Sequence, residues 1–128
     1  NIEILGLEST NVGETGIRNL TQLKKLRGLY LNLCPMVNDA ALRAVADFDT
    51  LEGLHLIATP ITDAGLLSLS NLDKLKTLQL ARTRVTDAGL RQLAQLKNLS
   101  SLDLAQTRTT EQSTNTLRKS LPKCAITQ

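Results

Sequence analysis

Aromatic side chains are nearly absent from this chain of 128 residues. It has no Trp, and Tyr30 and Phe48 are its only Tyr and Phe residues. Hydrophobic residues nevertheless make up 41% of the sequence, so Leu, Ile, Val and Ala must fill the core. The length suits one domain with a modest core. We therefore expect a single domain over residues 1–128 with an almost entirely aliphatic interior.

Other absences restrict the possible functions. No apolar run approaches the ~20 residues that a membrane-spanning helix needs, and no signal or transit peptide is recognisable. The chain has a single His, no phosphate-binding P-loop, no dinucleotide-binding glycine fingerprint and no Cys-x-x-Cys pair. We therefore expect a non-catalytic protein without catalytic residues, metal site or cofactor, and without a membrane partner.

The charge is mildly uneven along the chain. The formal net charge is +3, and it divides into −3 for residues 1–64 and +6 for residues 65–128. A nucleic-acid-binding surface usually combines clustered Lys and Arg with aromatic rings on which bases stack. The basic half contains no Tyr, Phe or Trp, so we expect no nucleic-acid partner.

A leucine pattern repeats every 24 or 25 residues. In the clearest unit, apolar residues follow Leu75 at Leu78, Leu80, Val85, Leu90, Leu93 and Leu96. The same slots recur upstream and downstream, which is typical of a repeat protein. The pattern predicts five repeats, covering approximately residues 2–25, 26–50, 51–74, 75–98 and 99–128.

Each repeat contains two different periodicities. Residues 75–81 (LKTLQLA) end in an alternation of apolar and polar positions, which predicts a short strand. Residues 87–96 (DAGLRQLAQL) place leucines three apart, which predicts one face of a helix. Stacked units of this kind form a parallel sheet on one side and a layer of helices on the other.

The sequence Thr-Asp-Ala-Gly occurs in both the third and the fourth repeat, between strand and helix. Either Asp63 and Asp87 or the threonines before them can cap the first helical turn, and Gly65 and Gly89 allow close approach of the neighbouring repeat. On this interpretation, replacing either Asp by Ala costs about 1 kcal/mol of stability. The alternative is a carboxylate cluster for metal or acid–base chemistry, which no His or Cys joins.

A second column of small polar residues follows the strands. Such side chains can satisfy backbone groups at a turn, and Cys34 has the volume to replace Thr there. We expect Cys34 to be a buried member of this column rather than a nucleophile, and Cys34 and Cys124 to be free thiols because several repeats separate them. The column consists of Thr10, Cys34, Thr59, Thr83 and Thr107.

Residues 29–42 (LYLNLCPMVNDAAL) resemble the cysteine-containing class of leucine-rich repeats, which is known from the substrate-recognition arms of F-box proteins. Residues 78–99 (LQLARTRVTDAGLRQLAQLKNL) resemble the Thr-containing repeats of large bacterial proteins. The resemblance implies an α/β fold, a right-handed solenoid with its parallel sheet on the concave face and its helices on the convex face. The ending LRKSLPKCAI resembles a closing turn, so we expect residues 99–128 to include a C-terminal cap. The amino end shows no comparable cap, and we expect the chain to be a fragment of a longer protein.

The residues that point outward from the strands vary between repeats, unlike the core columns. Tyr30 and His55 occupy equivalent positions on adjacent strands and should touch, while Gly28 and Gly53 leave a shallow floor beside them. Arginines beyond the strands can form a basic edge for a carboxylate or an acidic segment. The predicted partner-binding residues are Tyr30, Asn32, His55, Ile57, Gln79, Arg82, Arg84, Asp103 and Arg108.

These features together predict a protein–protein interaction module that binds a protein partner through the concave sheet face. Two alternatives remain open. The array can be a rigid structural spacer in a larger multidomain protein, or the substrate-recognition arm of an F-box-like adaptor. The identity of the partner and the cellular location do not follow from the sequence.

Overall fold

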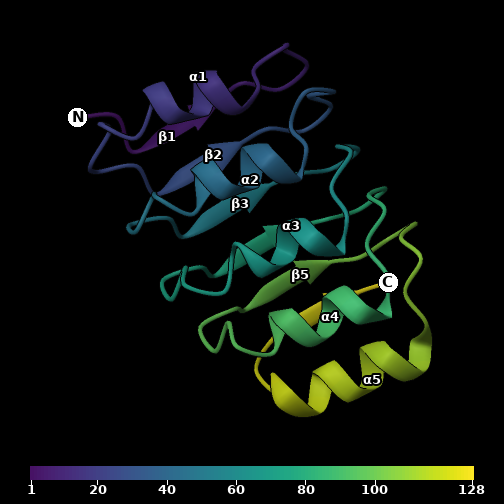
Figure 1. Cartoon of the computed structure of the whole chain (residues 1–128). Coiled ribbons are helices and arrows are strands. Elements are labelled where there is room, and N and C mark those ends of the chain that lie inside the picture. Colours follow the sequence, from purple (N-terminus) through teal and green to yellow (C-terminus); the bar gives the residue numbers. More distant parts are fainter.

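The computed structural model describes all 128 residues as a single curved array. Strands and helices alternate along the chain, and Figure 1 shows the strands on one side of the array and the helices on the other. The strands are β1 (Ile4–Gly6), β2 (Gly28–Tyr30), β3 (Gly53–His55), β4 (Thr77–Gln79), β5 (Ser101–Asp103) and β6 (Ala125–Thr127). The helices are α1 (Glu14–Asn19), α2 (Asp39–Val45), α3 (Asp63–Leu67), α4 (Asp87–Leu93) and α5 (Glu111–Ser120).

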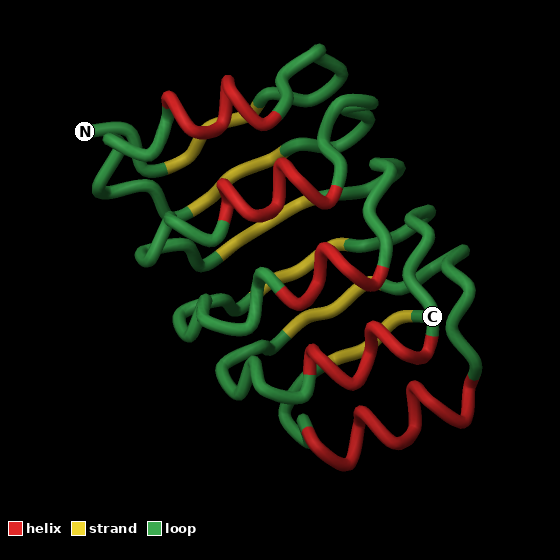
Figure 2. The backbone as a smooth tube through the Cα atoms, viewed as in Figure 1, coloured by secondary structure: helices red, strands yellow, loops and turns green.

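All six strands pair in parallel, in the order of the sequence, to form one sheet. Figure 2 shows this ladder of short strands beside the row of helices. The central residue of each strand pairs with its equivalent in the next repeat, as the leucine pattern predicts. This column consists of Leu5, Leu29, Leu54, Leu78, Leu102 and Ile126.

The core is one continuous aliphatic cluster between the sheet and the helices. The strand leucines Leu29, Leu54 and Leu78 are fully buried, and Phe48 supplies the only buried Tyr or Phe ring. The equivalent residues of the first repeat are only partly buried, because the outer edge of β1 has no neighbouring strand. None of the helices combines the length and the apolar character that a membrane crossing requires.

The helices of the first four repeats are shorter than the leucine spacing predicts. The expected helix over residues 87–96 ends at Leu93, and Leu96 lies in the following turn, where its N–H bonds to the Leu93 carbonyl at 3.0 Å. Leu96 is still buried. The third leucine of the set therefore reaches the core from a tight turn, which positions it as well as a further helical turn would.

The sixth strand, β6, is an element that the leucine pattern does not predict. Ile126 lies 24 residues after Leu102 and pairs with it, but the apolar slot two residues further on is occupied by Gln128. The guanidinium of Arg118, on α5, donates to the Ile126 carbonyl at 3.2 Å and connects this strand to the helix before it. The last repeat thus contributes a strand to the sheet as well as a helix to the helix layer.

The Thr-Asp-Ala-Gly motif joins neighbouring repeats. Thr62 and Thr86 occupy the N-cap positions, but only the Thr86 hydroxyl accepts from the first helical turn, from the Ala88 N–H at 3.3 Å. The carboxylate of Asp63 instead accepts from the backbone N–H of Thr86 at 2.8 Å and from its hydroxyl at 2.5 Å. A Cβ on Gly89 would collide with this carboxylate and lie 3.0 Å from a methyl carbon of Leu66. The glycine therefore leaves room for the aspartate of the preceding repeat.

A left-handed residue follows each of the first five strands. These five residues have φ values from 56° to 60°, although none is glycine: Ser9, Leu33, Ala58, Arg82 and Gln106. The residue that follows each of these five belongs to the predicted polar column. In that column, the hydroxyls of Thr59 and Thr83 donate to the carbonyls of Leu56 and Leu80. Cys34 is buried and donates to the Leu7 carbonyl at 3.1 Å, and both cysteines are free, as predicted.

Candidate functional site on the concave face

Tyr30 and His55 form an aromatic pair on the concave face. Their strands place them directly opposite each other, and the rings stack with centroids 4.2 Å apart and planes inclined by 16°. Both side chains are half-buried. The predicted contact is therefore present, and it forms a rigid platform that remains partly open to solvent.

The stack also affects the protonation of His55. Burial lowers the pKa of the imidazole below its ordinary value, and the nearby charge of Glu8 acts weakly in the opposite direction. Removing water from an ionisable ring disfavours its charged form. His55 therefore offers a largely neutral ring at neutral pH.

The polar residues of this face have structural tasks as well. Gln79 and Asp103 continue the row of Tyr30 and His55 on β4 and β5. Asp103 accepts from the N–H of Ala105 at 3.0 Å. In the adjacent row, the amide oxygen of Asn32 accepts from the N–H of Ile57 at 2.9 Å. Asn32 and Asp103 thus fix the chain where it leaves β3 and β5, which reduces their capacity to bind a partner.

A shallow depression of about 340 Å³ lies beside the aromatic pair. A Cβ on Gly53 would meet no atom within 4 Å, so this glycine forms an open floor. Gly28 is different, because Ile4 and the Tyr30 hydroxyl lie 3.3 and 3.4 Å from the position of its missing Cβ. The expectation that both glycines form an open floor therefore holds only for Gly53.

A row of alternating charges, which is not among the predicted site residues, borders this depression. Arg27 contacts Glu3 and Glu52 at 3.7 and 2.9 Å, and Lys76 contacts Glu52 at 2.9 Å. Hydrogen bonds from Lys76 and Arg27 hold the pKa of Glu52 below its usual value. The signal was present in the sequence, because each residue immediately precedes a strand at the repeat spacing.

The predicted arginines lie beyond the strands rather than on the sheet. Arg82, Arg84 and Arg108 are all exposed, and none of them belongs to an ion pair. They are therefore at the edge of the concave face, in the loops that lead from the sheet to the helices.

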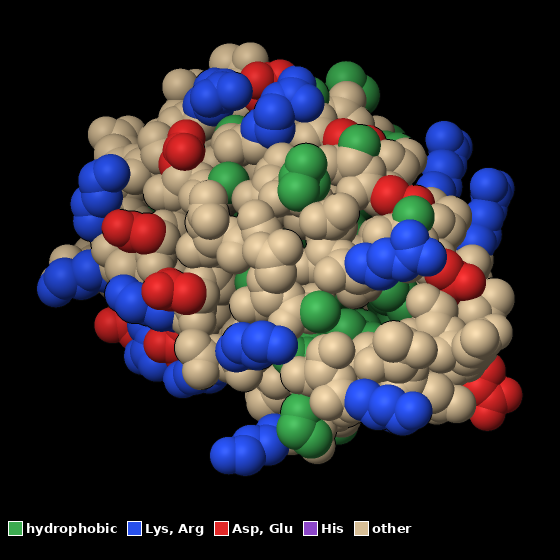
Figure 3. Space-filling view, turned by 60° about the horizontal axis from the view of Figure 1, so that its bottom comes forward, with side chains coloured by type: hydrophobic (Ala, Val, Ile, Leu, Met, Phe, Trp, Pro, Cys, Tyr) green, Lys and Arg blue, Asp and Glu red, His purple; other side chains and the backbone are tan.

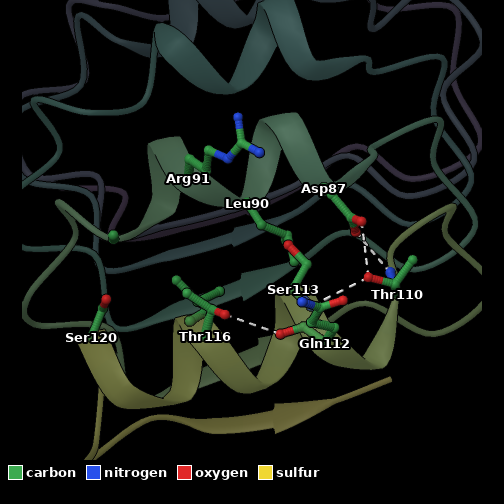
Figure 4. A pocket seen from close by; sticks show the side chains of 10 residues that line it. Asp87, Leu90, Arg91, Thr110, Gln112, Ser113, Thr116 and Ser120 are labelled. Carbon is green, nitrogen blue, oxygen red and sulfur yellow. Dashed lines mark hydrogen bonds between the residues drawn. The ribbon is translucent and has the colours of Figure 1, made fainter.

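The helix side contains a groove of about 440 Å³ between α4 and α5. The last repeat has Ser120, which lines the groove, in the slot where the fourth repeat has Leu96. Thr114, in the slot of Leu90, is fully buried and does not line the groove. Figure 4 shows Leu90 entering it from α4 opposite hydroxyl groups of α5, while the Asp87 carboxylate is bonded to Thr110. Those bonds lower the pKa of Asp87.

The surface around this groove is chemically mixed. In Figure 3, basic side chains project around the periphery and hydrophobic atoms form small separate groups.

The molecule contains no group of three or more His, Cys, Asp and Glu residues placed to hold a metal ion. The concave face remains the surface on which a ring pair, an open floor and a charged border lie together.

Comparison with known proteins identifies the fold. No protein-family model matches the chain, and no curated protein matches it in sequence. Among solved structures, an internalin from Listeria monocytogenes is similar with a TM-score of 0.73 and 25% identity over 86% of this chain. A leucine-rich repeat protein of Leptospira interrogans gives 0.66 and 26% over 85%. The ectodomain of the receptor kinase SOBIR1 from Arabidopsis thaliana gives 0.64 at 19% identity over 96%, a likeness of fold alone.

The fold is thus a leucine-rich repeat solenoid, as the sequence predicts. The chain spans only 30% of the internalin structure and 27% of the Leptospira one. The likeness to the cysteine-containing, F-box-associated subtype depends on Cys34 alone, because Thr occupies that slot in the other repeats. The subtype prediction is therefore not confirmed.

Proposed function

We propose that this chain is a non-catalytic protein-interaction module that binds a protein partner through its concave sheet face. The observation that supports this most directly is the stacked Tyr30–His55 pair beside the open floor at Gly53. Curved repeat arrays commonly present such concave surfaces to their partners.

The chemistry of the face suits a protein partner. Tyr is among the residue types that contribute most to binding energy, particularly when surrounding contacts exclude water. The Tyr30 ring is already held by His55, so little side-chain freedom is lost on binding. The charged row from Glu3 to Lys76 can serve as the polar rim that typically encloses an interface.

Catalysis is less well supported by this geometry. Acid–base chemistry requires a base within hydrogen-bond reach of its partners, whereas the His55 ring stacks on Tyr30. The nearest acidic residue in the same row, Asp103, lies two strands away and bonds to the backbone of its own loop. No contact in the structure favours the F-box-like adaptor specifically, and the rigid spacer is the alternative that an experiment must separate.

Site-specific photo-crosslinking separates these functions. A photoreactive phenylalanine analogue is placed at Gly53, on the concave face, or at the exposed Ala64 of α3, on the helix side. Each protein is irradiated in extract from cells that naturally produce it. Binding through the concave face predicts a discrete crosslinked protein from position 53 and none from position 64. A spacer gives no discrete product at either position, and the reverse pattern places the interface on the helices.

A further inference from the structure

The loops that follow the strands form a surface with two chemically different ends. We call it the loop edge and define it by Leu33, Met36, Ala58, Arg82, Arg84 and Arg108. Successive repeats contribute successive residues, so the edge runs along the array from apolar side chains in the second repeat to arginines in the fourth and fifth. The concave-face proposal does not explain this gradient.

Backbone hydrogen bonds hold these positions in register. The N–H groups of Leu33, Ala58 and Arg82 each donate at 2.9 Å to a carbonyl of the next repeat. The N–H groups of Arg84 and Arg108 donate at 3.0 Å to the preceding repeat. The loops therefore continue the ladder beyond the strands, and neighbouring positions are separated by about one strand spacing, ~4.8 Å.

The apolar end of the edge is unusually exposed. Leu33 and Met36 are 52% and 54% exposed, and they belong to the small group of large hydrophobic side chains that the fold leaves open to solvent. They are three residues apart in the loop of the second repeat, which carries its extra residue after Cys34. Exposed apolar side chains that gather in one place often indicate an interaction site.

The basic end has no internal counter-charge. Arg82, Arg84 and Arg108 form no ion pair, while the carboxylates of Asp87 and Asp103 accept backbone hydrogen bonds from their own surroundings. In Figure 3, basic side chains project on both sides of the molecule, including the right-hand side, on which the loops following the strands lie in Figure 1. Unpaired guanidinium groups are suited to bidentate binding of carboxylates.

We propose that the loop edge binds an extended acidic peptide segment that begins with an apolar residue. The apolar residue packs on Leu33 and Met36, and carboxylates that follow it reach Arg82, Arg84 and Arg108. The two ends are two to three repeats apart, about 10–15 Å, which an extended chain covers in about three to five residues. This inference rests on the proposed interaction function and extends it from the sheet to its edge.

The observations favour a protein segment over other anionic partners. The loop edge contains no aromatic ring on which a base can stack. It also carries three arginines rather than the denser basic cluster that anionic membranes usually require. An apolar anchor beside a short basic row matches a peptide with both kinds of side chain.

Selection from a random library of displayed twelve-residue peptides tests the proposal. The full chain is the target, and a folded triple variant (Arg82→Gln, Arg84→Gln, Arg108→Gln) is used for counter-selection. We expect enriched peptides to share an apolar residue followed, within three to five positions, by Asp or Glu. Their affinity should fall at least tenfold in the triple variant and at least fivefold in Leu33→Ser with Met36→Ser.

Two controls locate the effect. Replacing Arg43, Arg91 and Lys119 by Gln on the helix side makes the same charge change and should alter affinity less than twofold. Gly53→Phe, which fills the concave depression, should also leave peptide affinity unchanged.

The inference is overturned if no peptide is enriched, if the enriched peptides lack acidic residues, or if the helix-side variant weakens binding as much as the loop-edge variant. Tighter binding of single-stranded RNA or of phosphatidylserine vesicles at the same arginines would also overturn it. If Gly53→Phe abolishes binding of the enriched peptides while the arginine variant does not, the concave-face function stands and the loop-edge inference fails.

Discussion

The carboxylate of Asp63 receives two hydrogen bonds from Thr86, a residue 23 positions later in the chain. Asp39 and Thr62 form the same pair one repeat earlier, and Asp87 and Thr110 form it one repeat later. Each aspartate therefore connects the start of its own helix to the N-cap residue of the next helix. The repeated acidic motif joins repeats and has no need of a catalytic explanation.

Replacing Asp63 by Ala should lower the free energy of unfolding by about 2–3 kcal/mol, because two hydrogen bonds to a charged group are lost. This exceeds the cost expected for a simple helix cap. Urea denaturation followed by circular dichroism measures the change. Asp47→Ala removes an exposed carboxylate that makes no hydrogen bond and should change stability by less than about 0.5 kcal/mol. Equal effects of the two substitutions would refute the inter-repeat role.

Gly89→Ala should destabilise the protein because the new methyl group collides with the Asp63 carboxylate. Asp63→Ala removes that obstacle, so the two substitutions should be coupled. A double-mutant cycle measured by urea denaturation should give a combined loss smaller than the sum by at least about 0.5 kcal/mol. Strict additivity would show that the glycine is not there to accommodate the aspartate.

The leucine spacing predicts most of this fold because one residue type performs one task in every repeat. Leu54 and Leu78 had to be neighbours once the period was recognised, and the register confirms it. The helix ends could not be predicted, because Leu96 is buried equally well from a turn. The strand β6 was missed because polar Gln128 replaces the second leucine of its pair.

The candidate site was less predictable, because its geometry depends on side chains that the repeat does not constrain. The Tyr30–His55 contact follows directly from equivalent positions on adjacent strands. Whether Gly28 is open depends on where the Ile4 and Tyr30 side chains point, which a sequence pattern does not specify. The charged row at Arg27 and Glu52 was recognisable from its spacing, but exposed charges usually indicate only a solvated surface.

The pKa of His55 should lie below its ordinary value of about 6.5, because packing in the stack removes water from the ring. The unfolded chain then binds more protons than the folded one between the two pKa values. The contribution of neutral His55 to stability is therefore complete above about pH 6.5 and is lost as the pH falls.

Titration of the single imidazole by proton NMR measures this pKa. Tyr30→Ala should raise it toward the ordinary value, and His55→Gln should flatten the dependence of stability on pH between 7 and 5. A pKa above that of a model peptide, unchanged by Tyr30→Ala, would contradict the explanation by burial.

The double substitution Tyr30→Ala and His55→Ala should weaken the natural complex at least tenfold, which corresponds to about 1.4 kcal/mol, because truncating a central aromatic anchor usually costs this much. The fold should persist, since both side chains are only half-buried. Circular dichroism checks the fold, and calorimetric titration of the partner recovered by crosslinking measures the affinity. Unchanged affinity in a folded variant would remove the pair from the interface.

The most direct measurement compares Gly53→Phe with Ser101→Phe in binding to that partner. Both substitutions add the same ring to equivalent positions of the concave sheet, two strands apart. Gly53 has open space above it, so the added ring fills the depression without disturbing the core. Binding around Tyr30 and His55 predicts at least a tenfold loss of affinity for Gly53→Phe and a much smaller effect for Ser101→Phe. Full affinity in the Gly53→Phe protein would contradict the proposal that the concave face is the binding surface.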